Sequence, residues 1–256
     1  MSKLQTTARA LAPAIAVAAA LTCGGGATAA SLTEKFDVVG STWSSWTQKN
    51  NSTNLGDYQY WNQGCSVTCP FSAHEGVPAG SPGEEGAFIS VDYQSTRDLA
   101  GIETIDNWLI MPTKTFNNGD VLSFYTRTEA NSPYADSLEV RFGAGAAPSP
   151  GDGTGSVGSF TTLLLHINPS LAVGAYPEAW TFQTATITGL SGATNGAIAF
   201  RYHIVDGGPG GLNSNVVGID TVNITPAAPV PEPAVYLMMV LGLGAIGLRR
   251  MHAMRG

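Results

Sequence analysis

The feature that most constrains the fold is a period-two alternation of apolar and polar residues in the middle of the chain. Residues 198–204 carry an apolar side chain at every second position, and residues 138–142 and 180–183 repeat the pattern. Such alternation is typical of a strand with one buried face. Turns rich in glycine and proline separate the segments, and helical periodicity is almost absent. We therefore predict an all-β protein, built as an antiparallel jelly-roll sandwich.

Other short apolar runs extend this pattern along the chain. We expect further strands at residues 88–93, 108–111, 121–127, 160–167 and 216–224. Two long loops interrupt them, at residues 50–85 and 143–159. The second is composed largely of Gly, Ala, Ser and Pro, so we expect it to be mobile.

The beginning of the chain has the features of a secretory signal peptide. Lys3 and Arg9 precede an alanine-rich apolar stretch, and small residues occupy positions 27–29. We therefore assign residues 1–30 to the signal peptide. Residues 31–225 are long enough for one domain with a substantial core, and residues 226–229 form a short, stiff Pro-Ala-Ala-Pro linker.

The end of the chain, residues 230–256, has three parts in a fixed order. Pro231, Glu232 and Pro233 come first, an uncharged run of apolar residues follows, and Arg249 and Arg250 close it. A helix over residues 233–250 spans about 27 Å at 1.5 Å per residue, close to the roughly 30 Å of a hydrocarbon core. We predict a single transmembrane helix with a cytoplasmic C-terminus, because arginines that follow a span favour that side. A buried core helix is the alternative.

This tail resembles the PEP-CTERM sorting signal of Gram-negative bacteria. The resemblance implies recognition and cleavage by exosortase, a membrane protease-transpeptidase, in systems that accompany exopolysaccharide and biofilm production. It places the protein in the inner membrane first, with a periplasmic body, and then on the cell surface or in the extracellular matrix. The same tail is sometimes labelled an ice-binding protein C-terminal domain, but that label describes sorting.

The body resembles choice-of-anchor J domains, which are related to cleaved-adhesin and MAM-like jelly rolls. The matching segments are residues 32–37, 108–112, 122–127, 200–202 and 218–222. The resemblance implies a surface-displayed jelly roll that serves in adhesion or glycan binding. The Ile-Asp-Asp-Val of the family is Ile-Asp-Thr-Val here, which weakens any metal role at that position.

The charge of the body restricts its partners. Residues 31–248 contain 7 basic and 19 acidic side chains. Such an acidic surface disfavours nucleic acid and leaves carboxylates available for Ca²⁺. Jelly-roll domains often bind calcium where the first and last strands meet, which would bring Glu34 or Asp37 near Asp220. Glu34 and Asp37 as ordinary solvated edge residues are the alternative.

Two further groups of residues are candidates for a structural or binding role. Cys65 and Cys69 predict a disulfide in an oxidising compartment, since a zinc site that adds His74 lacks a fourth ligand. Tyr58, Tyr60 and Trp61 lie in loop-like sequence and are candidates for stacking on a glycan. A satellite cluster folded over the sandwich explains the same aromatic residues.

The sequence offers little evidence for catalysis. Its four histidines fall outside the known zinc-protease motif, and no Gly-x-Ser-x-Gly elbow occurs. Our first hypothesis is an exported, non-enzymatic surface or matrix protein that binds exopolysaccharide or a cell-surface glycan. A glycan-active hydrolase of the exopolysaccharide matrix is the second, and a structural matrix protein without a ligand is the third.

Overall fold

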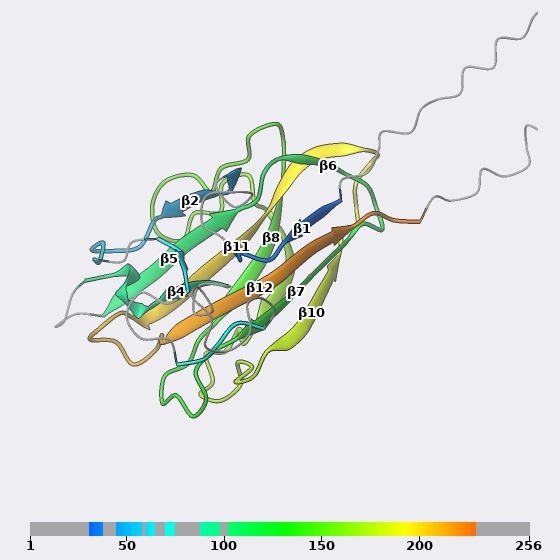
Figure 1. Cartoon of the computed structure of the whole chain (residues 1–256). Helices are drawn as coiled ribbons and strands as arrows, with labels where there is room; N and C mark the ends of the chain where they lie inside the picture. The colour runs from blue at the N-terminus through cyan, green and yellow to red at the C-terminus, as the bar shows by residue number, and fades with distance from the viewer. Residues whose placement is uncertain are drawn as a thin grey trace, which may run out of the picture.

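The computed structural model describes residues 31–37, 45–57, 60–64, 70–74, 88–97 and 102–228. They form two antiparallel six-stranded sheets that face each other (Figure 1). The first sheet contains β1 (Leu32–Glu34), β3 (Asn62–Gln63), β4 (Ile89–Asp92), β7 (Val121–Arg127), β10 (Thr181–Thr186) and β12 (Val216–Thr225). The second contains β2 (Thr47–Asn50), β5 (Glu103–Ile110), β6 (Lys114–Phe116), β8 (Leu138–Ala144), β9 (Thr162–Ile167) and β11 (Thr194–Gly207). The predicted all-β antiparallel sandwich is confirmed.

The strand order brings together segments that are distant in sequence. The first sheet runs β10-β7-β12-β4-β3, and β1 also pairs with β12. The second runs β2-β5-β11-β8-β9, and β6 also pairs with β11. β12, the last strand, therefore lies between β7 and β4 and aligns the turns that follow those two strands.

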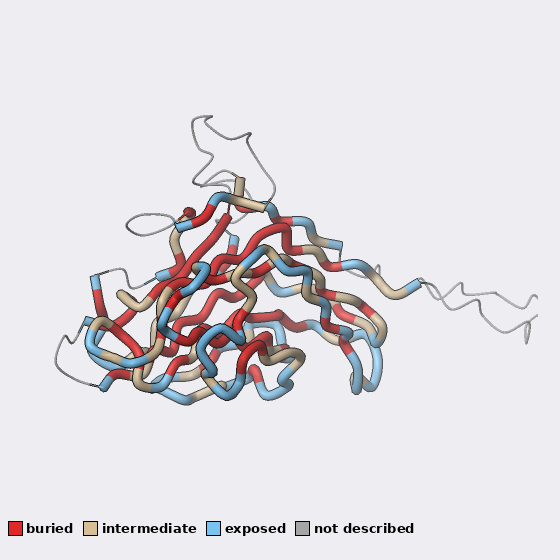
Figure 2. The backbone as a smooth tube through the Cα atoms, turned by 90° about the horizontal axis from the view of Figure 1, so that it is seen from below, coloured by how far each residue is buried: buried red, intermediate tan, exposed pale blue. Residues whose placement is uncertain are grey.

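The core lies between the two sheets and follows from the alternation. In β7, Leu122, Phe124 and Thr126 are buried, and the residues between them are partly exposed. Phe124 meets Phe200 of β11 across the sandwich, with ring centroids 5.0 Å apart and planes at 77°. Burying one such side chain contributes on the order of 2–3 kcal/mol. Figure 2 shows the buried backbone running along the strands and the exposed residues gathered in the turns.

The strands that the sequence analysis did not identify are short and polar. β2 reads Thr-Gln-Lys-Asn, β3 has two residues, and β6 has three. Backbone pairing with a neighbouring strand defines them: β2 with β5, β3 with β4 and β6 with β11. The alternation in their own sequences is too short to reveal them.

The outer face of the second sheet is also buried at its centre. Arg201 forms two hydrogen bonds to Asp106, Nε to Oδ1 at 2.7 Å and Nη2 to Oδ2 at 3.1 Å. Its Nη1 reaches Glu139 Oε2 at 3.1 Å, and its guanidinium lies 5.0 Å from the ring centroid of Trp108. The row joins β5, β11 and β8, and each charge has an opposite charge beside it.

The segment 145–160 covers this row. The amide of Gly155 donates to Asp106 Oδ2 at 2.9 Å, and the ring of Phe160 lies 5.5 Å from that of Trp108. Lys49 Nζ and Asp152 Oδ1 form an ion pair at 2.5 Å. The mobile loop expected from its composition is instead held on the sheet by hydrogen bonds, because its glycines allow turns that side chains would block.

The two ends of the sandwich differ. β1 begins opposite Ile224 in the last part of β12, so the first and last strands share one end (Figure 1). Asp120, fully buried, accepts the amide of Ala227 at 2.8 Å and thereby fixes the exit of the chain at this end. Within the described ranges no helix is long and apolar enough to cross a membrane, and the predicted span 233–250 lies outside them.

Candidate functional site

The end of the sandwich away from the chain exit carries two adjoining hollows. It is formed by the turns that follow β4, β7 and β11, around the first residue of β12 (Figure 1). The first hollow has a volume of about 260 Å³ and is lined by Tyr93, Tyr134, Pro209, Ser214 and Asn215. Tyr134 is 45% exposed, so much of its ring is open to solvent.

The second hollow shares Tyr93 and Pro209 with the first and has a volume of about 530 Å³. Asp57, Thr96 and Arg97 supply polar groups to its lining. Thr96 is 1% exposed, and its hydroxyl has no hydrogen-bond partner within the protein. An unpaired buried hydroxyl is unfavourable, and this one lies against the backbone of Gly208, which lines the first hollow.

Local structure fixes the position of Tyr93. It begins a short 3-10 turn (Tyr93–Ser95) directly after β4, and Asp92 caps the turn by accepting the amide of Gln94 at 2.8 Å. The amide of Tyr93 donates to the carbonyl of Asn215 at 2.9 Å. This bond places Tyr93 beside the loop that leads into β12.

The buried carboxylate of Asp136 links several residues at the same end of the sandwich by hydrogen bonds. It is 1% exposed and accepts bonds from Thr128 Oγ1 at 2.5 Å, the Tyr202 hydroxyl at 2.6 Å and the amide of Asn215 at 2.8 Å. Burial raises the pKa of Asp136 to about 6, although the hydrogen bonds from Asn215, Thr128 and Tyr202 oppose the shift. Asn215 is thus anchored by Asp136 on its amide side while it lines the first hollow.

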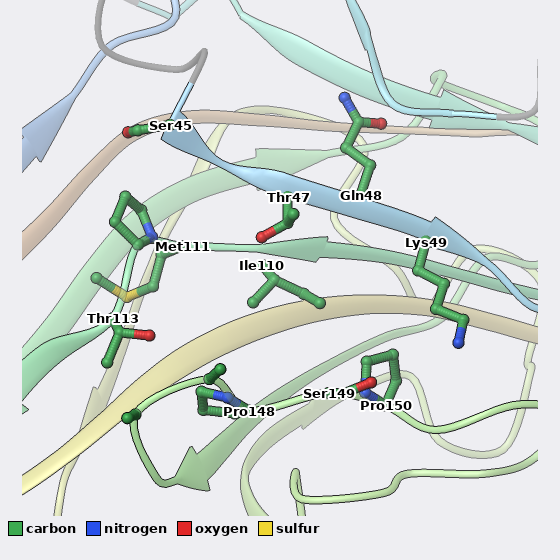
Figure 3. Close-up of a pocket in the computed structure, with 13 residues that line it drawn as sticks. Ser45, Thr47, Gln48, Lys49, Ile110, Met111, Thr113, Pro148, Ser149 and Pro150 are labelled. Atoms are coloured by element: carbon green, nitrogen blue, oxygen red, sulfur yellow. The ribbon is translucent and has the colours of Figure 1, made fainter.

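A third hollow, of about 580 Å³, lies on the outer face of the second sheet (Figure 3). Thr47, Lys49 and Ile110 point toward the segment that carries Pro148 and Pro150. Among the described residues no aromatic ring lines it. It lacks the flat apolar surfaces on which a sugar ring stacks, so we regard it as the weaker candidate.

The predicted calcium ligands are only partly brought together. Glu34 pairs with Val222, whose side chain is in the core, so Glu34 faces inward. Asp220 pairs with Tyr125, which alternates with the buried Phe124, so Asp220 faces outward and accepts the amide of His74 at 2.9 Å. A bulge between Asp220 and Asn223 causes this change of face.

A metal role for Glu34 and Asp37 stays a prediction. Glu34 Oε2 and Asp37 Oδ1 are both buried and make no hydrogen bond. The left-handed backbone of Phe36, with φ of 55°, turns the chain between the two carboxylates. Carboxylate and carbonyl oxygens suit Ca²⁺. Among the described residues, no group of three or more His, Cys, Asp or Glu side chains could hold a metal ion.

The predicted aromatic cluster of the first long loop is divided. Trp61 is 1% exposed and packs in the core, so its ring offers no face to a sugar in this structure. Tyr60 is 50% exposed. Tyr58, the cysteine pair Cys65 and Cys69, and the sorting motif with Pro231, Glu232, Pro233, Arg249 and Arg250 lie outside the described residues.

The sequence analysis missed Tyr93 and Tyr134, the two rings of the distal hollows. Tyr93 falls at the end of the predicted strand 88–93, and Tyr134 follows Pro133 in a turn. A tyrosine in a turn sequence is a usable signal for exposure. The 40 residues between Tyr93 and Tyr134 in the sequence conceal that the two rings line the same hollow.

Three of the described carboxyl groups, those of Asp106, Glu139 and Asp136, are engaged in hydrogen bonds within the protein. Asp106 and Glu139 share Arg201. Burial alone raises the pKa of Glu139, but hydrogen bonds and charge from Arg141 and Arg201 outweigh it and lower that pKa below its usual value. Asp136 has the raised pKa that a catalytic acid needs, but it is buried and bonded within the protein.

Comparisons with known proteins identify one short motif in the tail of the chain. The family model of the PEP-CTERM protein-sorting motif matches residues 229–251. This motif marks secreted, envelope-sorted proteins and implies processing by exosortase. None of the curated proteins matches the chain.

Several solved structures match the chain at low sequence identity and low structural similarity. The K1 cleaved adhesin domain of Lys-gingipain from Porphyromonas gingivalis W83 is 20% identical, with a TM-score of 0.43, over 78% of this chain and 99% of that chain. The K3 domain of the same protein is 16% identical, with a TM-score of 0.46, over 76% and 98%. A family 11 carbohydrate-binding module from Clostridium thermocellum, in complex with a β-1,3-1,4-mixed-linked tetrasaccharide, is 10% identical, with a TM-score of 0.39, over 80% and 100%.

The raised pKa of Asp136 predicts that its contribution to stability grows as the pH falls. Between about pH 6 and the usual aspartate value near 4, the folded protein binds a proton that the unfolded chain does not bind. The free energy of unfolding of the wild type, minus that of Asp136→Asn, should rise by roughly 2–3 kcal/mol from pH 7.5 to pH 4. Urea unfolding of both proteins at several pH values measures this difference.

The subtraction cancels the other titrating groups, including Glu139, which changes stability in the opposite direction. A difference that stays constant over this range would show that Asp136 titrates as it does in the unfolded chain.

The orphaned oxygens of Glu34 and Asp37 predict stabilisation by calcium. A ligand present at 100 times its Kd stabilises the folded state by about 2.7 kcal/mol, so the Tm in millimolar calcium should exceed that in EDTA by several degrees. Glu34→Gln keeps the shape and should abolish the shift, and Asp220→Asn should retain it. Equal Tm values of the wild type in calcium and in EDTA would rule out this site.

Proposed function

We propose that this protein is an exported, non-enzymatic surface or matrix protein whose jelly-roll domain binds glycan at its distal end. The observation that carries the proposal is the pair of hollows divided by Tyr93 and Pro209, with Tyr134 open beside them. Sugar rings present apolar faces and hydroxyl edges. Tyrosine rings stack on the former and retain a polar tip, and Asn215, Asp57 and Arg97 bond the latter.

The position of the hollows supports this function. The chain leaves the domain beside Asp120, at the far end of β12. β12 has ten residues, so about 33 Å separate the exit from the hollows at roughly 3.3 Å per residue. A domain attached through its C-terminal tail therefore turns the tyrosines away from its attachment.

Membership in the choice-of-anchor J family, which the strand sequences resemble, belongs to this proposal. We also propose that residues 233–250 insert in the inner membrane with a cytoplasmic C-terminus, and that the chain is cleaved near the Pro-Glu-Pro triplet. The unbroken apolar run between the triplet and the arginines supports both.

A glycan-active hydrolase is the second candidate. It would release product from the polysaccharide that it binds, whereas a non-enzymatic binding protein would release none. The hydrogen bonds that close Asp106 and Glu139 on Arg201 favour the non-enzymatic alternative. A structural matrix protein without a ligand is the third candidate, and absence of binding to every polysaccharide would favour it.

Removing the exposed ring at the distal end should weaken glycan binding. Tyr134→Ala deletes an apolar surface worth about 1.5–3 kcal/mol when it is covered, which corresponds to about a 10- to 100-fold weaker Kd. Affinity electrophoresis against a panel of polysaccharides measures the loss. Phe182→Ala is a matched control, since Phe182 is 54% exposed on the outer face of the first sheet, away from the hollows. Equal binding by Tyr134→Ala and the wild type would refute this site.

Processing of the tail is tested directly on the secreted protein. Mass spectrometry of protein from the medium or matrix should show loss of the residues that follow the Pro-Glu-Pro triplet, because the protease acts near this motif. Replacing Pro231, Glu232 and Pro233 by alanine should leave the full-length tail and retain the protein in the membrane fraction. Recovery of intact residues 234–256 from the secreted wild type would contradict cleavage.

A further inference from the structure

The two distal hollows differ from a pocket that holds one small molecule. They adjoin at Tyr93 and Pro209, which line both hollows and form the ridge between them. The first has about 260 Å³ and the second about 530 Å³. A ligand that fills both has at least two units joined across the ridge. A repeating chain satisfies this geometry.

The polar groups of the second hollow balance in charge. Asp57 and Arg97 both line it and both are exposed, one carboxylate and one guanidinium. Neither belongs to an ion pair recorded among the described residues. A carboxylate accepts hydrogen bonds and a guanidinium donates them, and a sugar hydroxyl does both. The hollow thus offers both partners to hydroxyl groups without a net charge.

Thr96 adds an observation that does not depend on charge. It lies in the isolated bridge Leu55–Thr96 and is 1% exposed, and its hydroxyl lacks a partner although it lines the second hollow. A neutral hydroxyl bonds readily with another neutral hydroxyl.

The negative charge of the domain disfavours the binding of anionic polymers. Acidic side chains outnumber basic ones by 19 to 7 over residues 31–248. An anionic polysaccharide approaching the distal end meets this repulsion, and among the described residues that line the hollows only Arg97 opposes it. A neutral chain does not experience it.

From these observations we infer that the ligand of the distal site is a linear, uncharged polysaccharide whose successive sugars occupy the two hollows on either side of Tyr93. The inference rests on the proposed glycan-binding function and names its substrate class. Tyr93 contacts sugars on both sides of the ridge, and the Thr96 hydroxyl completes its hydrogen bonding with a hydroxyl of the sugar in the second hollow.

The experiment compares three classes of polymer on the secreted protein. Mixed-linkage β-glucan, xylan and galactan serve as uncharged probes, alginate as the acidic probe and chitosan as the cationic probe, each at low and high salt. We expect retention by at least one uncharged polymer, with a Kd that changes less than twofold with salt. Retention by alginate alone, or by chitosan alone with loss at high salt, would overturn the inference but leave glycan binding in place. Failure of the protein to bind all five polymers would overturn the proposed function itself.

Two further measurements examine the two-hollow geometry with the uncharged polymer that binds. Oligosaccharides of increasing length should bind more tightly until both hollows are filled, and a monosaccharide that binds as tightly as the hexamer would refute the chain arrangement. Thr96→Val removes one hydroxyl, keeps the β-branched shape and should weaken binding about 5-fold. Thr184→Val, on an exposed position of β10, is the matched control and should leave binding unchanged. Equal binding by Thr96→Val and the wild type would remove Thr96 from the site.

Discussion

The distal end of this protein depends on the buried carboxylate of Asp136, which forms no ion pair with a described residue. Asp136 accepts hydrogen bonds from Tyr202 of the second sheet, from Thr128 in the turn after β7 and from the amide of Asn215 just before β12. These three groups come from different parts of the sandwich, and a single side chain fixes their relative positions. The desolvation that raises its pKa is the cost of this arrangement, and the hydrogen bonds offset part of it. Through Asn215, which lines the first hollow, these bonds connect the hollows to both sheets.

On the outer face of the second sheet, by contrast, the buried charges are paired with one another. Arg201 lies between Asp106 and Glu139, and the glycine-rich segment 145–160 removes the group from water. Each charge there is paired, so the desolvation of one side chain is offset by its neighbour. This pairing makes Asp106 and Glu139 unsuited to acid–base catalysis. Carboxylates closed on a buried arginine do not exchange protons with a substrate, and the segment that covers them blocks access to the sheet.

Sequence patterns could predict the sheets but only part of the site. Alternation in β7 and β11 predicts strands because each has one face in the core and is long enough to show the period. The distal site depends on strand order. β12 lies between β4 and β7, and this order alone brings Tyr93 beside Tyr134. The calcium ligands show a second limit, because one extra residue between Asp220 and Asn223 moves Asp220 to the other face from Glu34. The buried apolar residues shift phase at this point, from Val217 and Ile219 to Val222 and Ile224, but two residues on either side are too few to identify a bulge in advance.

The separation of the chain exit from the hollows has a consequence for affinity under the proposed function. Two tyrosine rings and a few hydrogen bonds give only a few kcal/mol of net binding, and −4.1 kcal/mol corresponds to a Kd of 1 mM. A polysaccharide, however, repeats its units, and a surface displays many copies of one protein. Linking such contacts raises the overall affinity by about 10² to 10⁴, provided that all copies face the same polymer. Asp120 fixes the exit at one end of β12, and Asp136 fixes the hollows at the other. With both ends fixed, every attached copy presents the same face outward, so weak individual sites suffice.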